Sequence, residues 1–179
     1  YVKTLDDRSF IKNEFYFGQY DFELYSNFTF FLDDPEYGDQ IRQKENRHIY
    51  LAGSEWNRTF DLGSLENHLR LGGKIRKDET KDSELSHTIN RAVTADTLQL
   101  GDIDETNLSV YGQCDIDWGK WLISPGVRYD QFSFQYSDKI EGGQHFASEG
   151  IVSPKLNLFY NHSDRLQLYI KSGYGFHSN

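Results

Sequence analysis

The chain has 179 residues, of which 37% are hydrophobic and 16% aromatic, and its formal net charge is −9. So few hydrophobic residues disfavour an ordinary packed soluble domain, while so many aromatic residues disfavour an intrinsically disordered chain. The negative charge, without any dense cluster of Lys and Arg, argues against a nucleic-acid partner. The longest apolar run is four residues, Ile49 to Ala52, whereas a membrane-spanning helix needs about 20.

Alternation of apolar and polar residues dominates the chain, and this period of two predicts β-strands. Residues 1–17 show it poorly, and we expect either a bulge near Gly18 or a separate strand end there. Seven strands are predicted, at residues 20–33, 46–56, 65–76, 105–118, 121–130, 152–161 and 166–176. In the first of these, the even positions such as Phe22, Leu24 and Phe28 are apolar, so we expect them to face lipid.

The predicted connections alternate in length along the chain. Residues 34–45, 77–104 and 137–151 form the long ones, and residues 57–61, 119–120 and 162–165 form the short ones. Long loops at one end and tight turns at the other are typical of bacterial outer-membrane β-barrels. Seven strands would leave two open edges in lipid, so we expect the chain to be a section of a larger protein.

Several segments of the chain are similar, in order and spacing, to one protein family. They are Asp21 to Pro35 followed by Gly38 to Ile41, Gly101 to Leu108 with Tyr111 to Gln113, Pro125 to Asp130, and Ser153 to Lys155 followed by Leu168, Tyr169 and Gly173 to Asn179. Over residues 20–179 they resemble the barrel of TonB-dependent receptors. Cys114 departs from the family pattern, where we expect an acidic or polar residue.

The resemblance implies an all-β fold, with residues 1–179 forming part of one antiparallel transmembrane barrel of about 22 strands in a Gram-negative outer membrane. It implies active uptake of a scarce nutrient, such as a metal chelate or siderophore, a vitamin or a glycan. The expected partners are outer-membrane lipid, the missing strands, an N-terminal plug, the TonB complex and the nutrient. The plug and the TonB-binding segment are absent from this sequence.

Two groups of candidate functional residues follow from their place along the chain and from whether they occupy the apolar or the polar positions of an alternating strand. Arg70, Arg128 and Asp130 lie at polar positions and are predicted to form an ionic network inside the barrel, with substrate contact as the alternative. Phe31, His87 and Tyr136 are predicted to contact substrate near the outer end, because aromatic and imidazole groups bind sugars, chelates and rings.

No motif in the sequence indicates catalysis or a resident cofactor. The six histidines form no pair at metal-ligand spacing, and no nucleophile or phosphate-loop motif is present. The acidic run Asp33 to Glu36, with Asp39, is predicted to be a solvated turn and not a calcium site. Two alternatives to a receptor remain open here. One is an outer-membrane porin or enzyme, and the other is a soluble carbohydrate-binding β-sandwich.

Overall fold

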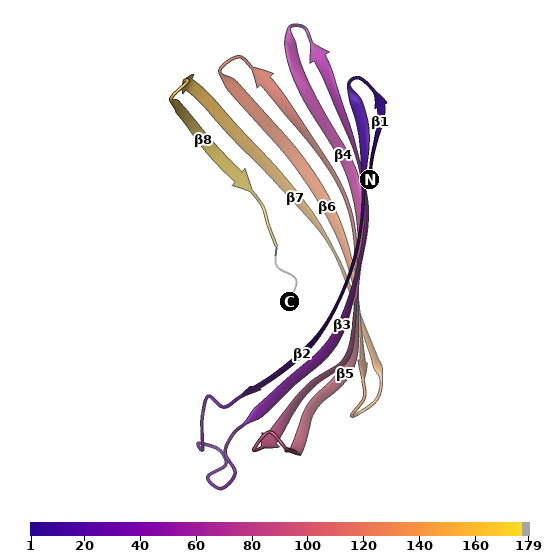
Figure 1. Ribbon diagram of the computed structural model, residues 1–179, viewed down its shortest axis with the longest axis vertical. Helices are drawn as coiled ribbons and strands as arrows, with labels where there is room; N and C mark the ends of the chain where they lie inside the picture. Colours follow the sequence, from indigo (N-terminus) through magenta and orange to yellow (C-terminus); the bar gives the residue numbers. More distant parts are fainter. Residues whose placement is uncertain (177–179) are drawn as a thin grey trace.

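The computed structural model describes residues 1–176 and shows a single antiparallel sheet in which every strand pairs with its neighbours in chain order (Figure 1). The eight strands are β1 (Val2–Asp6), β2 (Ser9–Ser26), β3 (Ile41–Leu62), β4 (Leu65–Ile89), β5 (Val93–Trp118), β6 (Trp121–Asp138), β7 (Gln144–Ser163) and β8 (Leu166–Gly173). The predicted all-β antiparallel fold is confirmed. A two-sheet sandwich does not fit, because all eight strands belong to one sheet.

Short turns join the strands at one end of the sheet, and each contains two residues. They lie at 7–8, 63–64, 119–120 and 164–165. Gly63 and Gly119 adopt φ angles of +68° and +65°. This left-handed conformation suits two-residue hairpin turns, because it follows the natural twist of the flanking strands. The opposite end carries the connections 27–40, 90–92 and 139–143.

The structure corrects several of the predicted boundaries. Residues 77–104 are mostly strand, since β4 and β5 continue toward each other and leave only 90–92 between them. The predicted connection 137–151 shrinks in the same way to 139–143. A 25-residue strand such as β4 extends over about 80 Å, far more than the roughly 30 Å of a hydrocarbon core. The apolar alternation therefore covers only part of each strand.

The beginning of the chain also differs from the prediction. Residues 9–26 form one continuous strand that pairs with β3 without a register shift, so there is neither a bulge at Gly18 nor a strand end there. β2 ends at Ser26, and residues 27–33 belong to the following loop instead of the strand. Val2–Asp6 adds an eighth strand, where seven were predicted.

The two faces of the sheet differ sharply in chemistry. The C-terminal segment returns across the concave side (Figure 1), where Phe176 packs edge-on against Phe132 with 5.2 Å between ring centroids. We call the face that carries Phe132 the concave face. It also carries the buried polar side chains Asn57, Asp78, Ser109, Ser124 and Asp130. Polar groups therefore line the inside of the curve.

The convex face is apolar over the middle of the sheet. Its side chains include Leu71, Ile75, Leu108, Val110, Val127 and Val152, each between 43% and 56% exposed. A soluble protein would bury such a band, whereas the wall of a membrane barrel presents it to lipid. The predicted lipid-facing positions are confirmed for β4 to β7 and for residues 166–173 of β8. Tyr174 and Phe176, which were predicted to continue this strand, lie beyond its end and on the concave side. Within residues 1–176 no helix is long and apolar enough to cross a membrane.

The prediction that Phe22 and Leu24 face lipid is wrong. Cα pairing joins Tyr20 to Arg47, and Arg47 to Thr80, on the concave face, and Phe22 and Leu24 follow Tyr20 at every second position. The convex side of β2 is instead formed by Phe15 and Phe17, which are 82% and 59% exposed. Phe28 lies beyond the strand, in the loop.

Candidate binding surface on the concave face

A tyrosine and two glycines shape the middle of the concave face. Tyr111 on β5 lies directly opposite Gly72 on β4. A Cβ atom at Gly72 would approach the Tyr111 ring to 2.4 Å, so only glycine allows the ring to lie across β4. The Tyr111 hydroxyl thereby reaches β3, where it donates a hydrogen bond of 2.8 Å to the Glu55 carboxylate. One side chain thus ties together three adjacent strands.

Lys155 occupies a similar position over the second glycine. It lies on β7 opposite Gly126 of β6, and a Cβ atom at Gly126 would come within 2.8 Å of its Cε. The aliphatic part of Lys155 therefore runs across β6 toward the centre of the sheet. On its other side, Lys155 pairs with Gly173 of β8. Small residues on both neighbouring strands leave space around the ammonium group.

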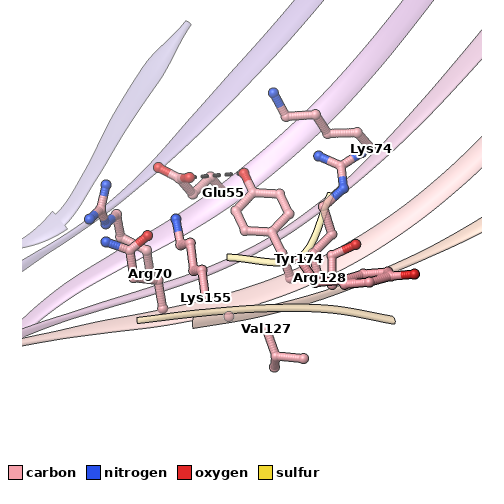
Figure 2. A pocket seen from close by; sticks show the side chains of 11 residues that line it. Glu55, Arg70, Lys74, Val127, Arg128, Lys155 and Tyr174 are labelled. Carbon is pink, nitrogen blue, oxygen red and sulfur yellow. Dashed lines mark hydrogen bonds between the residues drawn. The ribbon is translucent and has the colours of Figure 1, made fainter. Parts of the chain in front are cut away.

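The tyrosine, the lysine and their neighbours enclose a hollow of about 360 Å³ (Figure 2). Its polar lining comes from five strands and includes Glu55, Arg70, Lys74, Tyr111, Gln113, Arg128, Ser153 and Lys155. In Figure 2 Val127, at the base of the hollow, points away from these groups, toward the convex face. Four cationic side chains thus surround one carboxylate, an arrangement suited to binding and orienting a charged group.

Three of these four cations have acidic partners. Arg70 contacts Asp115 of β5 at 2.7 Å, and Lys74 pairs with Glu14 of β2. Arg128 makes two bonds to Asp130, from Nε at 2.7 Å and from Nη2 at 2.6 Å. The fully buried Asp130 also accepts a bond of 3.1 Å from Asn107, so its charge is well satisfied in the wall.

The structure places Arg70, Arg128 and Asp130, the predicted network residues, on the concave face. Arg128 and Asp130 pair with each other, while Arg70 pairs with Asp115, a partner that the sequence did not identify. Glu55, Tyr111 and Lys155 were missed. Glycines that lie opposite Tyr111 and Lys155 would have indicated these long side chains. However, two residues are recognised as opposite only once the register between the strands is known.

The three predicted substrate contacts lie at the other end of the sheet from the two-residue turns. Phe31 lies in the loop 27–40, and His87 is an exposed residue of β4 that pairs with Ile41. Tyr136 of β6 stacks on His145 of β7 with 6.3 Å between ring centroids. Within residues 1–176 no hydrogen bond or ring contact joins any two of the three, so their joint role stays a prediction.

The loop 27–40 is held by its own carboxylates. Asp39 accepts bonds from the backbone amides of Leu32 and Asp34 at 2.9 and 2.7 Å. The bond from the Asp34 amide, together with those from the Thr29 side chain and from other amides of the loop, lowers the pKa of Asp39 despite some desolvation.

No group of three His, Cys, Asp or Glu side chains that could hold a metal occurs in the described part of the chain.

A second ionic cluster lies at the same end of the sheet. Lys139, in the connection 139–143, contacts Asp102 of β5 at 2.6 Å and Asp82 of β4 at 2.7 Å. Bonding to Asp102 and then to Asp82 raises the pKa of the Lys139 ammonium. Asp102 also accepts the backbone amide of Asp82 at 3.0 Å, where the chain has a positive φ angle and a register shift. The cluster ties the connection 139–143 to β4 and β5.

A curved sheet with an apolar convex face and a polar concave face is the arrangement of a transmembrane β-barrel wall. Residues 2–179 match the family described as TonB dependent receptor-like, beta-barrel. The chain therefore belongs to the TonB-dependent receptor-like β-barrel family, as its sequence indicated. This is a family of receptors and not of enzymes. No curated protein matches the chain.

Solved structures of three transport proteins have a similar fold. The ferric citrate transporter FecA, in its unliganded form, has a TM-score of 0.79 and 17% identity over 96% of this chain and 25% of FecA. The ferric-catecholate import receptor Fiu of E. coli K12 has a TM-score of 0.73 and 10% identity, over 96% of this chain and 34% of Fiu. The ferric preacinetobactin receptor BauA of Acinetobacter baumannii has a TM-score of 0.65 and 8% identity, over 94% of this chain and 28% of BauA. This chain thus spans about a quarter to a third of each.

Proposed function

We propose that the chain forms part of the barrel wall of an outer-membrane receptor that imports a nutrient with energy supplied through TonB. The contrast between the two faces carries this proposal. Side chains such as Val110 and Val127 are exposed on the convex face and suit contact with lipid, whereas buried ionic groups such as Asp130 suit the inside of a closed barrel. Family membership supports the same location in the outer membrane of a Gram-negative bacterium.

The proposed partners follow from this location. A closed barrel needs further strands beside β1 and β8, because an open edge in lipid leaves backbone groups without hydrogen bonds. We propose that a plug fills the barrel against the concave face, and that the TonB complex moves the plug to release the ligand. Both expectations come from the family and not from residues of this chain.

For the substrate we propose an iron chelate. FecA, Fiu and BauA are described as proteins for ferric citrate, ferric catecholates and ferric preacinetobactin, respectively. Phe31, His87 and Tyr136 are the proposed contacts of this chain, because they lie at the end of the sheet that carries the longer connections, and those face outward in bacterial barrels. Vitamins and glycans are the alternatives within the same mechanism.

Uptake measured in cells tests this function. The full-length receptor is produced in a Gram-negative strain that lacks its own ferric citrate and ferric catecholate receptors, with and without a working TonB. Accumulation of radiolabelled iron, supplied as ferric citrate or as a ferric catecholate, is expected only when both the receptor and TonB are present. Uptake that persists without TonB, together with swelling of liposomes that contain the purified protein, would show an open porin instead.

A further inference from the structure

From the concave hollow we infer a binding site for an anionic group, a carboxylate, whose principal ligand is Lys155. This inference rests on the proposed function, because only a closed barrel brings a plug or a passing solute against the concave face. Nothing in the family membership assigns a role to Lys155 or to the hollow around it.

The charge balance of the hollow points to an anion. The side chains in and beside it include five cations, Lys12, Arg70, Lys74, Arg128 and Lys155, and four acids, Glu14, Glu55, Asp115 and Asp130. This local excess of positive charge occurs in a chain whose net charge is −9. The middle of the concave face therefore differs from the rest of the molecule in the sign of its charge.

Lys155 is the lining cation that the wall leaves uncompensated. Arg70, Lys74 and Arg128 each have a carboxylate within ion-pair distance, whereas Lys155 forms no ion pair within residues 1–176. Glu55, the acid of the lining, already accepts bonds from the Tyr111 hydroxyl at 2.8 Å and from the Asn57 amide at 3.0 Å. Lys155 is exposed on the isolated sheet, but once a plug fills the closed barrel its ammonium group is enclosed and needs a counter-charge.

The shape of the site favours a small anionic group. Gly126 and Gly173 flank Lys155 on the two neighbouring strands, and Ser153 precedes it on the same face. Because these residues are small, the ammonium group stays accessible within the 360 Å³ hollow. A carboxylate fits this space and bonds well to an ammonium group. It could come from an Asp or Glu of the plug or from a carboxylate-bearing solute in transit.

Carbodiimide cross-linking of the full-length receptor tests the site, because this reagent joins an amine of the protein only to a protein carboxylate in contact with it. Citrate activated in solution reacts with any accessible amine, so a bound citrate is shown by its selective attachment to Lys155 over the exposed Lys171. The wild type is treated with and without isotope-labelled citrate, and modified peptides are identified by mass spectrometry. The expected product is an amide between Lys155 and an acidic residue outside residues 1–179, or between Lys155 and labelled citrate. The first product assigns the carboxylate to the plug and the second to a solute.

Two variants and one matched control make the result specific. Lys155→Gln is expected to abolish the product, while Lys155→Arg preserves the charge and is expected to keep the barrel folded, as checked by its heat-dependent migration on gels. Lys171→Gln serves as the control, since Lys171 lies on the same face but packs over Phe159 and Tyr169, at 5.6 and 5.3 Å from their centroids. It is expected to leave the product unchanged.

Two outcomes would overturn the inference. One is a cross-link from Lys155 to Glu55, since the wall would then supply its own counter-charge. The other is the absence of any Lys155 product while Lys155 and Lys171 react equally with an amine-specific acetylating reagent. Neither outcome depends on whether uptake requires TonB, so failure of this site and failure of the proposed function are read from separate experiments.

Discussion

Tyr111 on β5 is bound to Glu55 on β3, two strands away, by a hydrogen bond of 2.8 Å that passes over Gly72 of the strand between them. Neighbouring strands of a sheet lie about 4.8 Å apart, so a side chain crosses a whole strand only where that strand carries no Cβ. The tie therefore depends on a residue that takes no part in the bond.

Replacing Gly72 by Ala is expected to break this tie. The new methyl group would lie 2.4 Å from the tyrosine ring, so Tyr111 must rotate away from Glu55. Because the clash is with the end of a half-buried side chain that can move aside, the expected cost is that of the lost hydrogen bond, about 1 kcal/mol. Denaturant unfolding of the full-length receptor in detergent measures the loss. Gly73→Ala is the control, because its Cβ would meet only ordinary contacts of 3.4 Å or more. Equal stability of the two variants would contradict the prediction.

Loss of the buried carboxylate at Asp130 is expected to destabilise the wall. Asp130→Ala leaves the Arg128 guanidinium and the Asn107 amide without their acceptor. Because the Arg128 side chain is 42% exposed and can recruit water, we expect a cost of about 2 kcal/mol, below the value for a fully buried pair. The same unfolding measurement applies.

The surface ion pair between Arg8 and Asp61 is the control for that change, because both of its side chains are about half exposed. Asp61→Ala is expected to cost much less than Asp130→Ala, because solvent screens an exposed ion pair. If Asp61→Ala proved as damaging as Asp130→Ala, burial would not be the property that makes Asp130 important.

The loop 27–40 is expected to loosen in acid. The pKa of Asp39 is lowered in the folded loop, so its ionised form stabilises the loop fully above the ordinary pKa of Asp. This contribution is lost as the pH falls through the lowered value. Hydrogen exchange at the amides of Leu32 and Asp34, corrected for intrinsic rates, is expected to speed up over that range. Asp39→Ala should show fast exchange at every pH. Exchange independent of pH in the wild type would refute the role of the carboxylate.

Labels on the two faces are expected to report opposite surroundings. Spin labels at Phe15, Val127 and Leu168 in the full-length protein should be accessible to oxygen dissolved in lipid, because these positions lie on the convex face. Labels at Phe22 and Leu24 should instead be shielded from lipid. Strong oxygen accessibility at both of the latter positions would reverse the assignment of faces for β2.

The sequence alone determined the class of fold and the orientation of most strands. Alternation in residues 65–76, 105–118, 121–130 and 152–161 identified the lipid-facing side correctly, because in those segments contact with hydrocarbon permits only apolar side chains at every second position. The same rule failed for residues 20–33. Along β2 the apolar residues change face, because Phe15 and Phe17 lie on the convex face whereas Tyr20, Phe22 and Leu24 lie on the concave face. The convex positions Asp21 and Glu23 are charged, so this part of the strand does not belong to the apolar band.

Only the tertiary structure decided the strand lengths and the choice of partners. Residues 77–104 lack clear alternation, yet they form strand because β4 and β5 satisfy each other's backbone groups well beyond the apolar band. The contacts of Tyr111 with Glu55 and of Lys155 with Gly126 depend on which residues lie opposite each other across strands. A shift of one residue in register would move each of these side chains to the other face, and a periodic pattern within one strand carries no information about that register.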